Sequence, residues 1–433
     1  MRSSDNTPKN YLRTFAIAIA VGFALWAVGA VGLRFAGGAF GHKPSEMVEG
    51  LSSDAQRLLA SAFEDVSPEA LVDHHVHVVG MGTNGTGTWV NPKMLNWTDP
   101  IARIQALTYL SSSDVTDPAR ADEQFVERLL DLAHGSGGGQ LLLLAFDYRH
   151  DDDGNRDLEH SEFYTPNEYV YNLSRWSPAV FVPAISVHPH RSDAVEALHK
   201  WADRGVRFVK WLPNAMGIDA SLARHDDYYR AMIERDMVLL THVGEERAVE
   251  AEEDQKLGNP LLFRRPLNLG VTVVMAHAAS SGSNEDFDHP GEDTLNFELF
   301  LRLMDEPRYE DLLYGEISAV TQVNRLPGPL VELLRRPDLH HRLVNGSDYP
   351  LPAINILFQT RALVQHGLIT AAERRALNEI YEYNPLLFDY VVKRTVRDPE
   401  SGRRFPASVF TGADLGPALR AASIPSTLSG AQR

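Results

Sequence analysis

Short apolar runs alternate with amphipathic segments along most of the chain. Eight runs are rich in the residues that favour β-strands, and the segments between them carry apolar residues at helical spacing. The runs are residues 70–79, 140–146, 180–187, 206–212, 237–242, 271–277, 312–318 and 342–346. Strands that alternate with helices form parallel βαβ units, and eight such units close a barrel. The pattern therefore predicts an α/β protein with a (β/α)8 TIM barrel.

The polar stretches of the chain also fit a barrel. Residues 80–100, 147–166 and 278–292 each follow an apolar run directly. A barrel places its functional loops at this point, after the carboxyl ends of its strands. We expect a functional site among these loops.

The N-terminal part has a different pattern. Residues 14–33 carry no charge and are flanked by Arg13 and Arg34. At a rise of about 1.5 Å per residue, a helix of this length spans roughly 30 Å, the hydrocarbon thickness of a bilayer. We predict a single transmembrane anchor; a cleaved signal peptide and a buried core helix are the alternatives. The flanking basic residues slightly favour an extracytoplasmic catalytic domain, and cleavage would make the protein secreted or periplasmic.

These patterns divide the chain into four parts. Residues 1–35 form the anchor or signal segment, and residues 36–69 form a linker with a lead-in helix. The barrel is predicted over residues 70–390. Residues 391–433 are polar and are predicted to form a partly disordered extension.

Composition and charge narrow the function. Apolar residues make up 44% of the chain and charged residues 23%, which is typical of a folded protein. The formal net charge of −17 disfavours binding to a phosphate backbone, so we expect no nucleic-acid partner. The chain has no cysteine, so a metal ion would have to be held by histidine and carboxylate side chains. A homo-oligomer is compatible with the sequence.

Five candidate site residues lie on, or directly after, four of these apolar runs. His75 and His77 are two apart on the first run, so both imidazoles face the same side of a strand. His242, His277 and Asp348 end or follow the fifth, sixth and eighth runs. Imidazole nitrogen and carboxylate oxygen are the ligands that zinc and similar ions take in catalytic sites. The alternative for the histidine pair alone is a hydrogen-bonded structural pair.

The order of these motifs resembles the amidohydrolase superfamily. The segments DHHVH, FVKWLPN, LLTHVGEE, VVMAHAAS and VNGSDYP are most similar to the amidohydrolase-related branch, which contains metal-dependent hydrolases and decarboxylases. The resemblance implies that His75, His77, His242 and Asp348 bind a divalent metal and that Asp348 accepts a proton from water. It implies that His277 orients water or substrate, or binds a second metal.

Four further residues are candidates for the site. By the resemblance, Lys210 is a bridging ligand if two metals bind; otherwise it pairs with a carboxylate or an acidic substrate, and we expect one metal per chain. His188, His190 and Arg191 follow the third run and are candidates for substrate contacts. A proline between the two histidines makes a turn the alternative.

The sequence thus predicts an enzyme with a small-molecule substrate. The leading hypothesis is metal-dependent hydrolysis of a C–N or C–O bond in an amide, lactone or ester, with zinc as the expected metal and manganese or iron as alternatives. A metal-dependent decarboxylase that uses the same residues is the second hypothesis. A non-catalytic, membrane-tethered barrel is the third.

Overall fold

The computed structural model describes residues 29, 32, 42–249, 251–412 and 415. Its centre is an eight-stranded parallel sheet in the order β1-β3-β5-β6-β7-β8-β11-β12. The strands are β1 (Val72–His77), β3 (Gln140–Leu144), β5 (Phe181–Ile185), β6 (Phe208–Trp211), β7 (Val238–Thr241), β8 (Thr272–Met275), β11 (Leu313–Glu316) and β12 (Leu343–Val344). Each strand lies within one predicted run, so the predicted barrel is confirmed.

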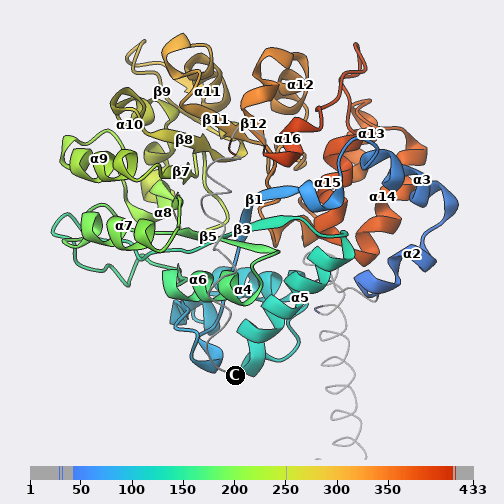
Figure 1. The fold of residues 1–433 in the computed structure, drawn as a ribbon, viewed down its shortest axis with the longest axis horizontal. Coiled ribbons are helices and arrows are strands. Elements are labelled where there is room, and N and C mark those ends of the chain that lie inside the picture. The colour runs from blue at the N-terminus through green and yellow to red at the C-terminus, as the bar shows by residue number, and fades with distance from the viewer. Residues whose placement is uncertain (1–28, 30–31, 33–41, 250, 413–414, 416–433) are drawn as a thin grey trace, which may run out of the picture.

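Helices surround these strands (Figure 1). They are α2 (Met47–Gly50), α3 (Ser53–Ala62), α4 (Pro100–Ser112), α5 (Ala121–Gly135), α6 (Asn167–Trp176), α7 (Ala194–Asp203), α8 (Pro213–Met216), α9 (Asp226–Glu234), α10 (Arg264–Leu269), α11 (Asn296–Met304), α12 (Gly328–Arg335), α13 (Thr360–Gln365), α14 (Ala371–Tyr383), α15 (Pro385–Thr395) and α16 (Ser408–Thr411). Two helices, α4 and α5, separate β1 from β3. The first crossover is therefore longer than a single βαβ unit requires.

The barrel interior is filled with apolar side chains. Leu142 and Leu144 of β3 belong to the same buried cluster as Val238 and Leu240 of β7. The intervening Leu143 packs in a different cluster with residues of α5 and α6. This follows from the alternation of side chains along a strand, which sends every second residue inward. Polar groups at the carboxyl ends therefore lie above a packed core.

The chain after β12 completes the barrel beside β1. The backbone N–H of His74 donates to Asn345 O at 2.9 Å, and the N–H of Asp348 donates to His75 O at 2.7 Å. The N–H of His77 donates to Tyr349 O at 3.0 Å. Because these bonds extend beyond the two residues of β12, they bring Asp348 alongside the histidines of β1.

The long loops carry short antiparallel pairs. β2 (Trp89–Val90) pairs with β4 (Phe163–Tyr164), which joins the loop after β1 to the loop after β3. β9 (Ser283–Glu285) pairs with β10 (Asp293–Leu295) in the loop after β8. The predicted loop segments are thus structured over the carboxyl ends of the strands.

The C-terminal part differs from the predicted division. The proposed boundary at residue 390 falls inside α15, and α15 packs with α14 and α3 beside β1 (Figure 1). Phe405 and Phe410 are 1% and 0% exposed. Residues 391–412 of the predicted extension pack against the barrel, because apolar side chains recur among the polar ones. Residues 413–414 and 416–433 lie outside the described part of the chain, so the predicted partial disorder stays a prediction.

The predicted membrane segment, residues 14–33, lies outside the described residues except for Gly29 and Gly32. Among the helices that the structure does describe, none has both the length and the apolar character needed to cross a bilayer. The anchor stays a prediction from the sequence.

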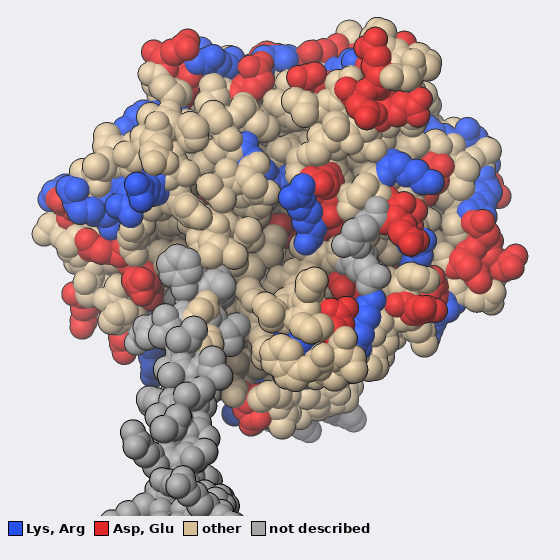
Figure 2. Space-filling model, turned by 180° about the vertical axis from the view of Figure 1, so that it is seen from behind, with Lys and Arg blue, Asp and Glu red and all other residues tan. Residues whose placement is uncertain are grey.

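Charged side chains of both signs lie on the surface. On the face drawn in Figure 2, lysines and arginines lie among aspartates and glutamates around the edge of the molecule. The described part of that face therefore presents mixed charge rather than a continuous basic surface.

Candidate metal centre

Strand β1 places two imidazoles at the mouth of the barrel. His75 is 1% exposed, and the His77 side chain is 23% exposed. Their Nε2 atoms lie 3.2 Å apart. Both side chains face the same point because they are two residues apart on an extended strand.

Asp348 and His277 reach this point from two other parts of the barrel. Asp348 Oδ1 lies 3.1 Å from His77 Nε2 and 3.5 Å from His75 Nε2. Asp348 Oδ2 lies 3.9 Å from His277 Nε2. Asp348 and His277 have φ angles of 61° and 58°, which residues other than glycine rarely adopt. Such backbone conformations concentrate at functional sites, where the surrounding structure holds them.

A glutamate that the sequence analysis did not single out orients the imidazoles. Glu316, at the end of β11, is 0% exposed and accepts a hydrogen bond from His75 Nδ1 at 2.9 Å. Ser318 Oγ donates to the same carboxylate at 2.6 Å and lies 2.7 Å from His277 Nδ1. Glu316 lies near the carboxyl end of the seventh apolar run, residues 312–318, as the other candidate residues lie near the ends of theirs. This position was the signal in the sequence that could have identified it.

The remaining predicted histidine follows β7. His242 Nδ1 lies 3.3 Å from Glu246 Oε2, and no hydrogen-bond partner of His242 Nε2 is found within the described chain. The ring of His242 lies 5.0 Å from that of His277, centroid to centroid. A buried polar atom without a partner is costly unless a ligand satisfies it.

The neighbours of Nδ1 assign one tautomer to His75, His242 and His277. Nδ1 of His75, His242 and His277 each faces an oxygen atom, which assigns the ring proton to Nδ1 and leaves the Nε2 lone pair directed toward the shared point. Ligating histidines are held in this way, with the second nitrogen bound to a carboxylate or another oxygen.

Burial favours the uncharged form of the histidines. Burial lowers the pKa of His242 to about 3 and lowers the pKa values of His75 and His277 well below the ordinary range. Burial opposes ionisation of Asp348, but the neighbouring imidazoles of His75 and His77 outweigh it and hold the pKa of this carboxyl below its usual value. Neutral imidazole and ionised carboxylate are the forms that bind metal.

The donor distances fit a divalent metal ion. Two ligand atoms about 2.1 Å from an ion at a tetrahedral angle lie about 3.4 Å apart. The separations of 3.1 to 3.5 Å among His75, His77 and Asp348 match this value. One donor atom each from His75, His277 and Asp348 lie within 4.8 Å of one another. The residues present therefore suit a metal ion, with His77 and His277 both close to His75 and Asp348 and with the ring of His242 beside that of His277.

Lys210 lies in the same cluster. Its Nζ is 3.2 Å from His75 Nε2, and the residue is 1% exposed. Burial lowers the pKa of Lys210 to about 8, which the negative charges of Asp348 and Glu316 partly oppose. The lysine predicted from the fourth run is thus part of the site.

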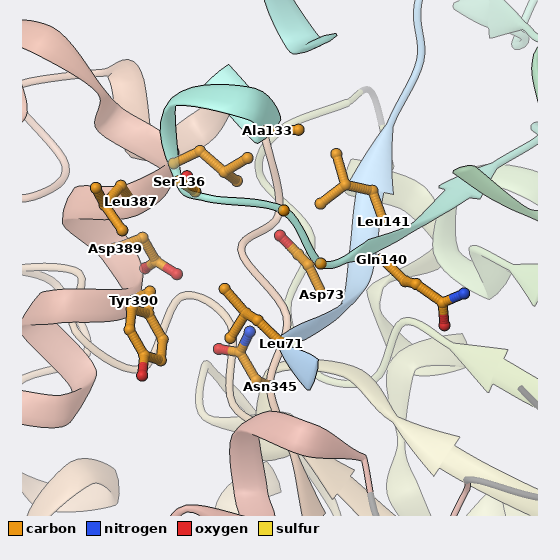
Figure 3. A pocket seen from close by; sticks show the side chains of 13 residues that line it. Leu71, Asp73, Ala133, Ser136, Gln140, Leu141, Asn345, Leu387, Asp389 and Tyr390 are labelled. Carbon is orange, nitrogen blue, oxygen red and sulfur yellow. The ribbon is translucent and has the colours of Figure 1, made fainter. Parts of the chain in front are cut away.

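A buried network supports the joint between β1 and the segment that carries Asp348. Asp73 accepts hydrogen bonds from the backbone N–H groups of His75 at 3.0 Å and Ser347 at 2.8 Å. Lys393 Nζ donates to Gly346 O at 2.5 Å and to Asp389 at 2.6 Å. Asp73 and Asp389 line a small cavity of about 20 Å³ next to this joint (Figure 3). The network fixes the backbone on both sides of the candidate metal centre.

Gly346 is required by close packing beneath the histidines. A Cβ atom at this position would lie 2.4 Å from Glu316 Oε1 and 2.8 Å from His75 Cβ. Only a residue without a side chain lets the strand end approach both groups.

The cluster forms the floor of a large cavity of about 610 Å³. His75, His77, Lys210, His242 and Asp348 all line it. Arg325 also lines it and donates to Ser280 Oγ at 2.9 Å. The volume lies in the range of pockets that bind small molecules.

The three candidates after the third run lie elsewhere. His188 Nε2 faces Met216 O at 2.8 Å, and His190 Nδ1 faces Asp151 O at 3.0 Å. Arg191 forms an ion pair with Asp147 at 2.9 Å. None of His188, His190 and Arg191 lines the large cavity. Strand β5 ends at Ile185, so this second histidine pair lies in the loop after the strand and is not directed at the site.

Comparisons with known proteins yield matches among solved structures. No family model matches the chain, and no curated protein matches its sequence. A 5-carboxyvanillate decarboxylase from Sphingomonas paucimobilis is 12% identical, with 81% of this chain and 98% of that chain covered and a TM-score of 0.42. A 4-oxalomesaconate hydratase from Rhodopseudomonas palustris is 13% identical, with the same coverage and a TM-score of 0.40. An uncharacterised TIM-barrel protein from Bordetella bronchiseptica is 15% identical, with 72% of this chain and 99% of that chain covered and a TM-score of 0.42.

A putative amidohydrolase from Staphylococcus aureus is also among the solved structures that match, at 14% identity and a TM-score of 0.35, with 66% of this chain and 89% of that chain covered. At these identities and TM-scores the matches carry no argument about the reaction or about individual residues. The case for a function rests on the geometry of this chain.

Proposed function

We propose that this protein is a metal-dependent hydrolase that cleaves a C–N or C–O bond of an amide, lactone or ester. The observation that supports this most strongly is the cluster at the cavity floor. Histidines whose Nε2 atoms lie close together converge there with an ionised Asp348, at separations that suit ligands of one divalent ion. In this proposal His75, His77, His242 and Asp348 hold one ion, with zinc as the expected metal and His277 beside it.

The residues of the cluster have separate tasks in the proposed reaction. A divalent cation held in such a site would act as a Lewis acid and would lower the pKa of a water molecule to about 7. Asp348 accepts the proton of the attacking water and passes it to the leaving nitrogen or oxygen. Glu316 keeps the imidazole of His75 oriented through Nδ1. His277, held by Ser318, positions the reacting carbonyl.

Two cations that line the cavity, Lys210 and Arg325, favour one alternative reaction. Neither Lys210 nor Arg325 forms an ion pair with a carboxylate of the described residues. A cation that forms no ion pair with a carboxylate of the described residues suits a carboxylate-bearing substrate. A metal-dependent decarboxylase acting on such an acid is therefore our second candidate.

A comparison of two products tests both candidates. The zinc-loaded full chain is incubated with a panel of amides, lactones, esters and aromatic acids, and acid release and carbon dioxide release are measured in parallel. We expect acid release by the wild type and a loss of at least a hundredfold in Asp348→Asn. Carbon dioxide release without hydrolysis would select the decarboxylase. Turnover of neither class by a metal-loaded, folded chain would contradict the proposal.

We also propose that residues 14–33 anchor the protein in a membrane with the barrel on the extracytoplasmic side. Support comes from the length of the uncharged segment and its flanking basic residues. Cell fractionation, with protease added to intact cells, tests this placement. Recovery of the full-length chain in the soluble fraction would contradict it.

A further inference from the structure

The walls of the large cavity differ from its floor. The floor carries the imidazoles, Lys210 and Asp348, whereas the walls are formed largely by apolar side chains, including Val78, Leu144, Phe163 and Leu212. A cavity with one polar end and apolar walls suits a ligand with the same division.

The apolar surface continues from the walls to the mouth of the cavity. Ile101 and Ile104 of α4 and Ile356 line the cavity, yet they are 81%, 54% and 43% exposed. Ile101 and Ile104 are three residues apart on a helix and therefore lie on one face. Large apolar side chains that are exposed together beside a cavity are typical of a ligand-binding groove.

Helix α4 is held in place across the cavity by its polar side chains. Tyr109 Oη donates to Ala248 O at 2.6 Å, and Gln105 Nε2 donates to the same carbonyl oxygen. The opposite face of α4 buries Ala102 and Ala106 against Val90. These contacts fix the helix, so the exposed isoleucines form a defined wall of the site.

Two charged side chains beside the isoleucines neutralise each other. Arg247 and Glu245, which also line the cavity, form an ion pair with each other at 2.8 Å. A ligand at the mouth therefore meets a neutralised pair and three isoleucines.

We infer that the substrate carries an extended apolar chain that lies along α4 and Ile356 while its polar end reaches the metal-binding cluster. This inference rests on the proposed function for the identity of the polar end. The substrate class is a soluble amphiphile, an amide, ester or lactone with a hydrocarbon chain. Transfer of each methylene from water to an apolar wall strengthens binding about fourfold.

Binding of a homologous series tests the inference. The full chain is placed in lipid nanodiscs and titrated calorimetrically with n-alkyl hydroxamic acids of increasing chain length, from acetohydroxamic to octanohydroxamic acid, with empty nanodiscs as the blank. Titrations are run with zinc and without it. We expect affinity to rise about fourfold per methylene in both conditions, because the walls and not the metal contact the chain. An affinity that does not change with chain length would overturn the inference.

A double variant tests the role of α4. Ile101→Gln with Ile104→Gln should lower the affinity for octanohydroxamic acid at least fivefold more than the affinity for acetohydroxamic acid. Both side chains are exposed and glutamine favours helices, so the fold should persist, which circular dichroism checks. Ile233→Gln on α9, at an isoleucine 38% exposed and away from the cavity, is the matched control and should behave as the wild type. Equal losses for the long and short ligands in the double variant would contradict the role of α4.

The outcomes separate this inference from the proposed function. A zinc-loaded chain that hydrolyses no ester, amide or lactone but binds hydroxamates with chain-length dependence would refute the hydrolase and support the apolar site. Hydrolysis without any chain-length dependence of binding would support the hydrolase and refute the apolar site.

Discussion

Replacing Glu316 with glutamine tests how the site is oriented. Every neighbour of this carboxylate is a donor: His75 Nδ1 at 2.9 Å, Ser318 Oγ at 2.6 Å, the N–H of His277 at 3.3 Å and the N–H of Ser318. An amide of the same shape must turn its NH2 group toward one of these donors. Glu316→Gln therefore removes a charged acceptor and creates one unfavourable donor–donor contact.

The magnitude follows from two independent rules. A hydrogen bond to a charged group contributes about 1.5–3 kcal/mol. Loss of a carboxylate that orients a ligating histidine lowers metal affinity about 10- to 100-fold, which is about 1.4–2.8 kcal/mol. The two ranges agree, so we expect zinc affinity to fall by about 10- to 100-fold in Glu316→Gln.

Competition with a chromogenic chelator measures this change in the full chain. Thermal unfolding of the chelated protein shows whether the variant is folded. Glu298→Gln on α11, at an exposed glutamate, is the matched control and should bind zinc as the wild type does. A folded Glu316→Gln variant with wild-type zinc affinity would refute the role assigned to this carboxylate.

Three further predictions concern packing beneath the site, the pH dependence of stability and the proton acceptor. Gly346→Ala should lower the free energy of unfolding in urea by about 1–3 kcal/mol, because the added Cβ would collide with Glu316. Gly328→Ala is the control and should not, since a Cβ there would meet no atom within 4 Å. Equal unfolding midpoints for the two variants would argue against the close approach at Gly346. Glu373 is buried in part, but its arginine partner and its helix cap hold its pKa at about 2, below the ordinary 4.5. The ion pair of Glu373 contributes about 1 kcal/mol to the free energy of unfolding, because the pair is partly exposed. This contribution is present above pH 4.5 and is lost as the pH falls toward 2, so Glu373→Gln should flatten the pH dependence of stability between these values. An unchanged profile would exclude the ion pair. Asp348→Asn should keep the fold and lose at least a hundredfold in activity, and retention of activity would transfer the proton-accepting role to another group.

Much of the fold could be predicted from the sequence because each strand is a short apolar run between helical segments. The histidine pair on β1 could be predicted for the same reason, since the period of a strand fixes where two residues two apart will point. His242, His277 and Asp348 followed because the carboxyl ends of parallel strands meet at one end of a barrel.

Other features depend on contacts that no local pattern reveals. Glu316 bonds to a histidine 241 positions away, and its burial distinguishes it from the exposed glutamates of the chain. The placement of α4 across the cavity depends on two bonds to Ala248, far along the sequence. The packing of residues 391–412 depends on a few buried aromatic side chains within a polar segment.

Metal content is the most direct test of the metal centre. Elemental analysis of the purified full chain, beside a variant with both His75→Ala and His77→Ala, gives the number of divalent ions per chain. We expect about one ion in the wild type and none in the variant. A folded wild-type chain that holds no divalent metal after zinc or manganese has been supplied would contradict the metal centre and, with it, the proposed hydrolase.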